Sequence, residues 1–201
     1  MRKKAQIILT FCILFILMGC SVNQEKDNQV INHKEIAEDL KIKATYEKKY
    51  IDLLKTELLK KEDISAVHIF YNDITNDGAF TGFSYRIGDK LFIGSSYGIA
   101  YNPNPIVYKI ETRVNDFNDP LTFQFMNDKL KTNPPRDYQV IVGYINDESI
   151  KSIQLNYKNG IKEVVNIENN MFMSVKIANP DSLMSITSPH DDSKVFLLIE
   201  R

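Results

Sequence analysis

The chain of 201 residues is long enough for one domain together with a leader and a tether. Its composition, 43% hydrophobic and 25% charged, is typical of a folded protein and excludes a largely disordered one. The formal net charge is −1, and it becomes about −4 when the three basic residues at positions 2–4 are set aside. This mildly acidic balance argues against nucleic-acid binding, which requires clustered basic residues.

The N-terminus has the pattern of a signal peptide. Basic residues 2–4 precede an apolar run over residues 5–18, and a polar segment, 21–29, follows it. As a helix the run would span roughly 21 Å, which is shorter than a hydrocarbon core of about 30 Å. The alternative, a membrane-spanning anchor, needs about 20 apolar residues. We therefore expect residues 1–19 to be a leader that is removed.

Four residues at the end of this leader, Leu17-Met18-Gly19-Cys20, resemble the lipobox of bacterial lipoproteins. Met18 departs from the smaller residue that is more usual at its position. The resemblance implies that the Cys20 thiol carries a diacylglyceryl group and becomes the first residue of the mature protein. Two acyl chains hold a protein stably on a bilayer. The expected location is therefore the extracytoplasmic face of a bacterial cell membrane, and the abundant Lys, Asn and Ile suggest a Gram-positive bacterium.

The remainder of the chain divides into a tether and a domain. Residues 20–33 comprise the lipidated cysteine and a polar, flexible segment, and residues 34–201 form an extracytoplasmic domain. Apolar residues three and four apart predict an amphipathic helix, or two, between positions 34 and 61. The segment 131–137, "KTNPPRD", suggests a sub-boundary within the domain.

Beyond residue 63 the chain consists of strand-like runs separated by turn dipeptides, so we predict an α+β fold with mainly antiparallel strands, as a sheet or a sandwich. Gly88-Asp89 and Asn159-Gly160 are the strongest hairpin signals. A two-residue loop at Asn159-Gly160 pairs Leu155 with Val164. It sends Val165 to the opposite face, which requires either a second covered face or a bulge.

Motifs that carry chemistry are few. The sequence contains no G-x-S-x-G, H-E-x-x-H or C-x-x-C spacing and no glycine-rich phosphate loop. Its two cysteines fall in the leader and at Cys20, and its three histidines are far apart along the chain. We therefore expect no cofactor and no enzymatic activity.

The segment "DITNDG", residues 73–78, imitates the first half of a calcium loop, with oxygen-bearing side chains at Asp73, Thr75 and Asp77. Its twelfth position is Ser84 in place of the bidentate glutamate that such loops use. A hairpin turn explains the same residues and is the preferred interpretation.

A second candidate lies in "GSSYGIAYNPNP", residues 94–105, whose Gly, Ser, Tyr and Asn content suits a binding loop. Tyr97 and Tyr101 are the candidate ligand-binding residues, and an irregular connection with both rings packed on the sheet is the alternative. Exposure of both rings would favour binding, and burial of both would exclude it.

These observations favour a membrane-anchored, extracytoplasmic lipoprotein with a non-catalytic binding or accessory role in the cell envelope, held to the membrane through Cys20. Its expected partner is an envelope protein, which an exposed apolar patch would accommodate. A small-molecule- or ion-binding lipoprotein is the alternative and would show one concave pocket with convergent polar groups. A third hypothesis, a hydrolase that uses carboxylates, requires two Asp or Glu side chains facing each other across a cleft.

Overall fold

The computed structural model describes residues 33–60, 64–101, 103–178, 182–189 and 191–198. The expected signal peptide, Cys20 and residues 21–32 of the tether lie outside this part of the chain. The chain divides into two compact units, 1–37 and 38–201, and the sheets belong to the second. The described part of the chain contains one helix, α2 (His33–Leu59), which is followed by eleven strands.

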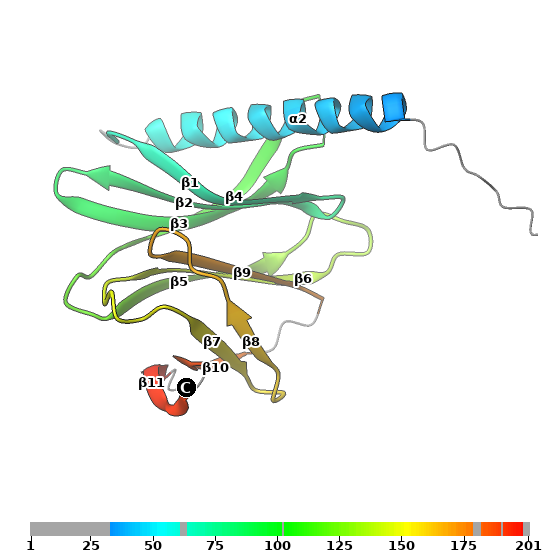
Figure 1. Ribbon diagram of the computed structural model, residues 1–201. Helices are drawn as coiled ribbons and strands as arrows, with labels where there is room; N and C mark the ends of the chain where they lie inside the picture. Colours follow the sequence, from blue (N-terminus) through cyan, green and yellow to red (C-terminus); the bar gives the residue numbers. More distant parts are fainter. Residues whose placement is uncertain (1–32, 61–63, 102, 179–181, 190, 199–201) are drawn as a thin grey trace, which may run out of the picture. The chain divides into compact units, whose positions relative to one another are not determined.

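The strands form three antiparallel sheets (Figure 1). The first sheet has the order β1-β2-β3-β4 and the second the order β5-β6-β9. The third has the order β11-β10-β7-β8. The bounds are β1 (Val67–Thr75), β2 (Gly78–Ile87), β3 (Lys90–Ile99), β4 (Ile106–Val114), β5 (Leu121–Lys129), β6 (Asp137–Ile145), β7 (Ile153–Tyr157), β8 (Lys162–Val165), β9 (Met171–Ile177), β10 (Leu183–Ser188) and β11 (Asp191–Leu198). The predicted α+β class with mainly antiparallel strands is confirmed.

Helix α2 packs on the outer face of the first sheet through side chains four residues apart. Tyr50, Leu54 and Leu58 are buried there, whereas Leu40 is 61% exposed, so the apolar contact begins only in the second half of the helix. The Tyr50 hydroxyl lies 3.2 Å from the Ser96 hydroxyl on β3. A Cβ at Gly98 would lie 2.6 Å from the Tyr50 ring, so this close approach requires glycine.

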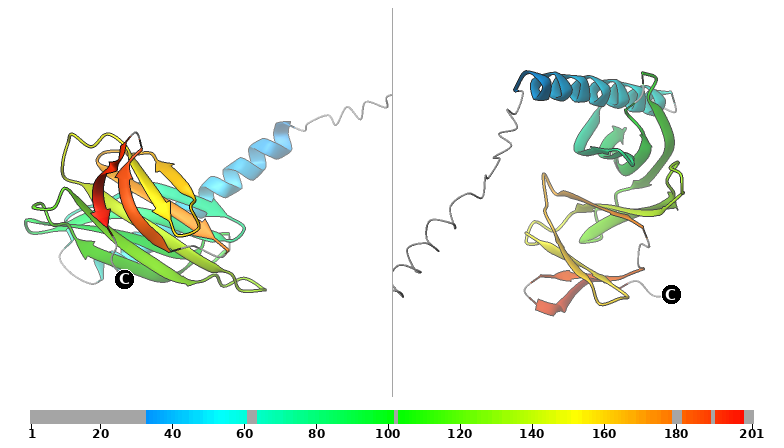
Figure 2. Two further views of the ribbon diagram at one scale, coloured as in Figure 1. Left: turned by 90° about the horizontal axis from the view of Figure 1, so that it is seen from below. Right: turned by 90° about the vertical axis from the view of Figure 1, so that its right-hand side faces the viewer.

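The three sheets lie in successive layers, as Figure 1 and the right-hand view of Figure 2 show. Between the first and second sheets Phe80, Tyr97 and Tyr138 are buried together, with ring centroids 4.8–5.4 Å apart. Between the second and third sheets the buried side chains are mostly aliphatic. They include Leu121, Ile141, Ile145, Ile153, Leu155, Phe172 and Ile186. Each face of the second sheet is therefore covered by apolar side chains.

Local turn chemistry accounts for two hairpins. Gly88 and Asp89 join β2 to β3, and Gly88 has a φ of 56°, which a first turn residue of this kind needs. Residues 76 and 77 join β1 to β2. The proposed sub-boundary, 131–137, connects β5 to β6, which are neighbours in the second sheet.

The expected register at Asn159-Gly160 is wrong by one residue. Leu155 pairs with Glu163 and not with Val164, because the connection between β7 and β8 is longer than two residues and only Gly160 has a positive φ. This shift turns Val165 toward the same face as Leu155 and leaves Val164 61% exposed. It also turns Glu163 toward the second sheet.

Candidate functional site

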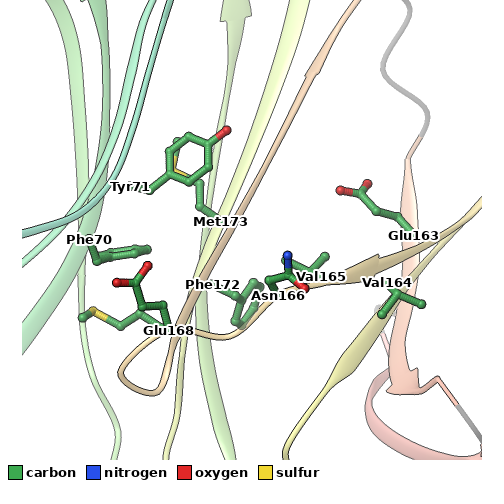
Figure 3. Close-up of a pocket in the computed structure, with 10 residues that line it drawn as sticks. Phe70, Tyr71, Glu163, Val164, Val165, Asn166, Glu168, Phe172 and Met173 are labelled. Atoms are coloured by element: carbon green, nitrogen blue, oxygen red, sulfur yellow. The ribbon is translucent and has the colours of Figure 1, made fainter. Parts of the chain in front are cut away.

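Three edge strands meet along one side of the domain. β1 ends the first sheet, β9 the second and β8 the third, and β9 contacts both of the others. They line a cleft of about 350 Å³ (Figure 3). Edge strands carry unpaired backbone groups that favour association with other chains. Here the edges partly cover one another and enclose a small concave site.

One wall of the cleft is aromatic and depends on an irregularity in β1. Ile69 pairs with Phe83 and Tyr71 with Gly82, so Phe70 is an extra residue in the strand, a β-bulge. Successive side chains of a regular strand point to opposite faces, but here Phe70 and Tyr71 both line the cleft. A Cβ at position 82 would lie 2.8 Å from the Phe70 ring, so Gly82 provides the space that this wall occupies.

The opposite wall carries a polar network centred on Glu163. Its Oε1 accepts a hydrogen bond from the Ser174 hydroxyl (2.9 Å), and its Oε2 accepts one from the Tyr157 hydroxyl (3.2 Å). Lys176 Nζ lies 2.9 Å from the same Oε2 and 4.4 Å from the centroid of the Tyr157 ring. The network joins β8 of the third sheet to β9 of the second, and it occupies both oxygens of the carboxylate.

Burial and nearby carboxylates raise the pKa values of two tyrosines in this region. Burial raises the pKa of Tyr157, and the neighbouring charge of Glu163 raises it further. Burial also raises the pKa of Tyr71, with the charges of Asp73 and Glu163 as additional causes. Both phenols therefore retain their protons at neutral pH and well above it.

Two further polar side chains, Asn166 and Glu168, line the cleft from the connection between β8 and β9. Asn169 and Asn170 both have positive φ (50° and 65°), and the backbone of Glu168 exchanges two hydrogen bonds with Met171. This is the geometry of a tight hairpin turn of type I′, which holds Glu168 beside the cleft. Within the described residues, the side chains of Asn166 and Glu168 have no hydrogen-bond or ion-pair partner.

Figure 3 shows the Glu168 carboxylate directed toward the Phe70 ring, with Asn166 between Glu168 and Glu163 in this view. The floor is apolar and is formed by Met171, Phe172 and Met173. An apolar floor with a few convergent polar groups is the usual composition of a small-molecule site. Because Tyr157, Ser174 and Lys176 occupy Glu163, the arrangement suits binding better than the acid–base chemistry of a carboxylate pair.

Two other hollows in the described part of the chain offer less. One of about 210 Å³ lies at the end of α2 and is lined mainly by aliphatic and aromatic residues, among them Leu58, Tyr85 and Phe92. Another, of about 360 Å³, is lined by five residues of α2 alone. The first has no charged residue among the described residues of its lining, and the second is formed by a single element.

The candidate calcium residues lie at and beside a hairpin turn. Asp77 forms an ion pair with Arg136, and the Thr75 hydroxyl accepts a hydrogen bond from the Asp77 backbone (3.2 Å). Asp73 lies in β1, where its charge acts on Tyr71. In the described part of the chain, no group of three or more His, Cys, Asp or Glu is placed to hold a metal ion.

The two candidate tyrosines do not share a surface. Tyr97 is buried between the first and second sheets, where its hydroxyl accepts a hydrogen bond from the Lys131 backbone (2.8 Å). Tyr101 is 37% exposed and contacts Tyr46 of α2, on the other side of the first sheet. Residues 94–99 of the expected loop belong to β3.

None of the residues that line the cleft was singled out from the sequence. Phe70, Tyr71, Glu163 and Glu168 are far apart along the chain, and only the pairing of the sheets brings their strands together. The Asn-Asn dipeptide at 169–170 was the one local signal for the turn beside Glu168, since asparagine tolerates positive φ.

No helix among the described residues is both long and apolar enough to span a bilayer. Comparisons with protein-family models, with curated proteins and with solved structures give no match for this chain. Functional inference therefore depends on the cleft and on the sequence of residues 1–20.

Proposed function

We propose that the protein is a membrane-anchored, extracytoplasmic lipoprotein with a non-catalytic binding role, and that its ligand is a small molecule held in the cleft between β1, β8 and β9. The single observation that supports this function is the convergence of an aromatic wall, an apolar floor and partnerless polar side chains on about 350 Å³ of concave space. This observation favours the small-molecule alternative over docking of an envelope protein.

The anchor in this proposal comes from the lipobox resemblance at residues 17–20. A diacyl group on Cys20 would hold the domain at the outer face of the cell membrane, with residues 21–33 as the tether. For the fold, we propose that the stacked sheets form a sandwich and that α2 is the amphipathic element nearest the tether.

Ligand binding is tested by purifying the mature, lipid-anchored protein in nanodiscs and identifying co-purifying small molecules by mass spectrometry. Asn166→Trp fills the cleft from an exposed position, so the fold should survive while the bound molecule is lost. Ile161→Trp, at a 51% exposed position outside the cleft, is the matched control and should keep the ligand. A co-purifying molecule retained equally by both variants would contradict the site.

The anchor is tested by metabolic labelling with an alkyne fatty acid, followed by membrane fractionation. Cys20→Ser should abolish the label and prevent processing of the leader. Cys12→Ser, inside the expected leader, should leave both label and processing unchanged. Labelling of the Cys20→Ser protein at the wild-type level would refute lipidation at this position.

A further inference from the structure

The charged side chains that line the cleft are acidic. Among the described residues that line it, the acidic side chains are Glu163 and Glu168, and none is Lys, Arg or His. Lys176, beside the cleft, is already engaged by Glu163 and by the face of the Tyr157 ring. The carboxylate of Glu168 has no such partner within the described part of the chain, so its charge is available to a ligand.

The aromatic wall adds a second attraction of the same sign. The face of an aromatic ring is electron-rich and attracts a cation that lies within about 6 Å of its centroid. Phe70 and Tyr71 both line the cleft because of the bulge in β1. The Tyr71 phenol is protonated at neutral pH, so this residue offers both a hydroxyl that can donate a hydrogen bond and an aromatic ring.

We propose that the cleft selects a small amphipathic organic cation, a protonated amine carried on an apolar body. The ammonium group lies between the Glu168 carboxylate and the rings of Phe70 and Tyr71, with the Asn166 side chain beside it. The apolar body packs on Met171, Phe172 and Met173. This inference depends on the proposed function, because it names the ligand class of the same cleft.

The geometry disfavours the other two classes of small ligand. An anion would meet the unpaired Glu168 carboxylate, and like charges repel each other. A neutral molecule would bury part of that carboxylate without compensating its charge. A cleft of about 350 Å³ is near the lower end of the usual range for ligand sites, so the apolar body is small, of the size of one ring.

Methionine methyl groups provide built-in reporters for the test. The mature chain contains four methionines, of which Met171 and Met173 line the cleft, Met126 is buried between the sheets and Met184 is exposed on β10. The mature, lipid-anchored protein, labelled with ¹³C at its methionine methyls and held in nanodiscs, is titrated at neutral pH. Three probes share a phenylethyl body and differ in the charge of the group attached to it: phenethylamine is a cation, 2-phenylethanol is neutral and 3-phenylpropionate is an anion.

We expect phenethylamine to shift the signals of Met171 and Met173 but not those of Met126 and Met184. Its affinity should exceed that of the alcohol and of the carboxylate by roughly tenfold, the value of one charge-assisted contact. Glu168→Gln should weaken amine binding by a similar factor and should not weaken alcohol binding, because it removes the charge that a neutral ligand leaves uncompensated. Phe70→Leu should weaken amine binding about two- to fivefold, through loss of the cation–π contact.

Asp52→Asn, at an exposed position of α2 outside the cleft, removes the same charge and should leave amine binding unchanged. If the alcohol or the carboxylate shifts the Met171 and Met173 signals with equal or higher affinity, the cation inference is wrong and the cleft remains a ligand site. If none of the three probes shifts these two signals, the cation inference and the cleft as the binding site both fail.

Discussion

Phe80 and Phe70 contribute to the same apolar cluster between the first two sheets, yet their surroundings differ. Phe80 lies in β2, inside the sheet, and is fully buried against Tyr97 and Tyr138. Phe70 lies in the bulge of the edge strand β1 and forms a wall of the open cleft. An aromatic ring in an inner strand has a neighbouring strand on each side, and these strands help to cover it. A ring in an edge strand has a neighbour on one side only, so part of it stays accessible to a ligand.

The same contrast holds for the polar groups of the two regions. In the closed interface, the hydroxyl oxygen of Tyr138 is buried without a hydrogen-bond partner in the described structure. Beside the sheet edges, the hydroxyl of Tyr157, in the inner strand β7, donates a hydrogen bond to Glu163 of the edge strand β8. The closed interface is stabilised by packing and contains a hydroxyl without a hydrogen-bond partner. Near the sheet edges the buried hydroxyl has a partner, and other polar groups remain available for binding.

Truncation of the two phenylalanines should give the largest effect. Phe80→Ala leaves a cavity in the closed interface and should lower the free energy of unfolding by about 3 to 5 kcal/mol. Phe70→Ala opens a site that water already reaches and should cost about 1 to 2 kcal/mol. Urea unfolding followed by circular dichroism measures both. Equal losses would show that Phe70 is as much a core residue as Phe80.

Alkaline pH should destabilise the folded protein through its buried tyrosines. Burial raises the pKa values of Tyr50, Tyr97, Tyr138 and Tyr157, so the folded state retains phenol protons that the unfolded state releases above about pH 10. This stabilisation is complete below that pH. It is lost above it by about 1.4 kcal/mol per pH unit for each tyrosine that remains protonated.

The measurement is thermal unfolding at a series of pH values with tyrosinate absorbance recorded in parallel. Tm should fall steeply above about pH 10. Tyr157→Phe removes one of the four phenols, so it should make the decrease of Tm with pH less steep. Appearance of the full tyrosinate signal while the protein is still folded would contradict the expected shifts.

Breaking the ion pair at the sheet edges should have an intermediate effect. Glu163→Gln leaves Lys176 without its carboxylate and weakens the connection between β8 and β9. Both side chains are about 30% exposed, at 31% and 28%, so the loss should be about 1 to 2 kcal/mol and not the larger cost of a fully buried pair. A double-mutant cycle with Lys176→Met isolates the pair. A coupling energy near zero would show that the two charges are solvated independently.

The smallest effect should have the opposite sign. Tyr138→Phe removes a buried hydroxyl that lacks a partner and should stabilise the protein by about 1 kcal/mol. Tyr157→Phe removes a bonded hydroxyl of similar burial and should destabilise it by about the same amount. Both are measured by urea unfolding. Destabilisation by Tyr138→Phe would indicate that a bound water satisfies this group.

The candidate site was much harder to predict from the sequence than the fold class. The Asp73, Thr75 and Asp77 pattern matched half of a calcium loop, but Asp77 is paired with Arg136 across the domain. The residues around Tyr97 have the composition of a binding loop. However, Tyr97 lies in strand β3, which continues to Ile99, and its ring is buried. In both cases the sequence neighbours of a residue suggested one role, and a contact with a residue distant in the sequence determined a different one.

Local patterns in the sequence were sufficient for the α+β class, the antiparallel strands, the helix and the hairpin at Gly88-Asp89. Each of these depends on periodicity or turn preference over a few residues. Only the tertiary structure decided the bulge at Phe70, the pairing of Leu155 with Glu163 and the meeting of three sheet edges. The physical reason is that side chains alternate along a strand with a period of two. A shift of one residue therefore exchanges the two faces, and the packing of neighbouring sheets selects the register that buries Val165 and turns Glu163 toward β9.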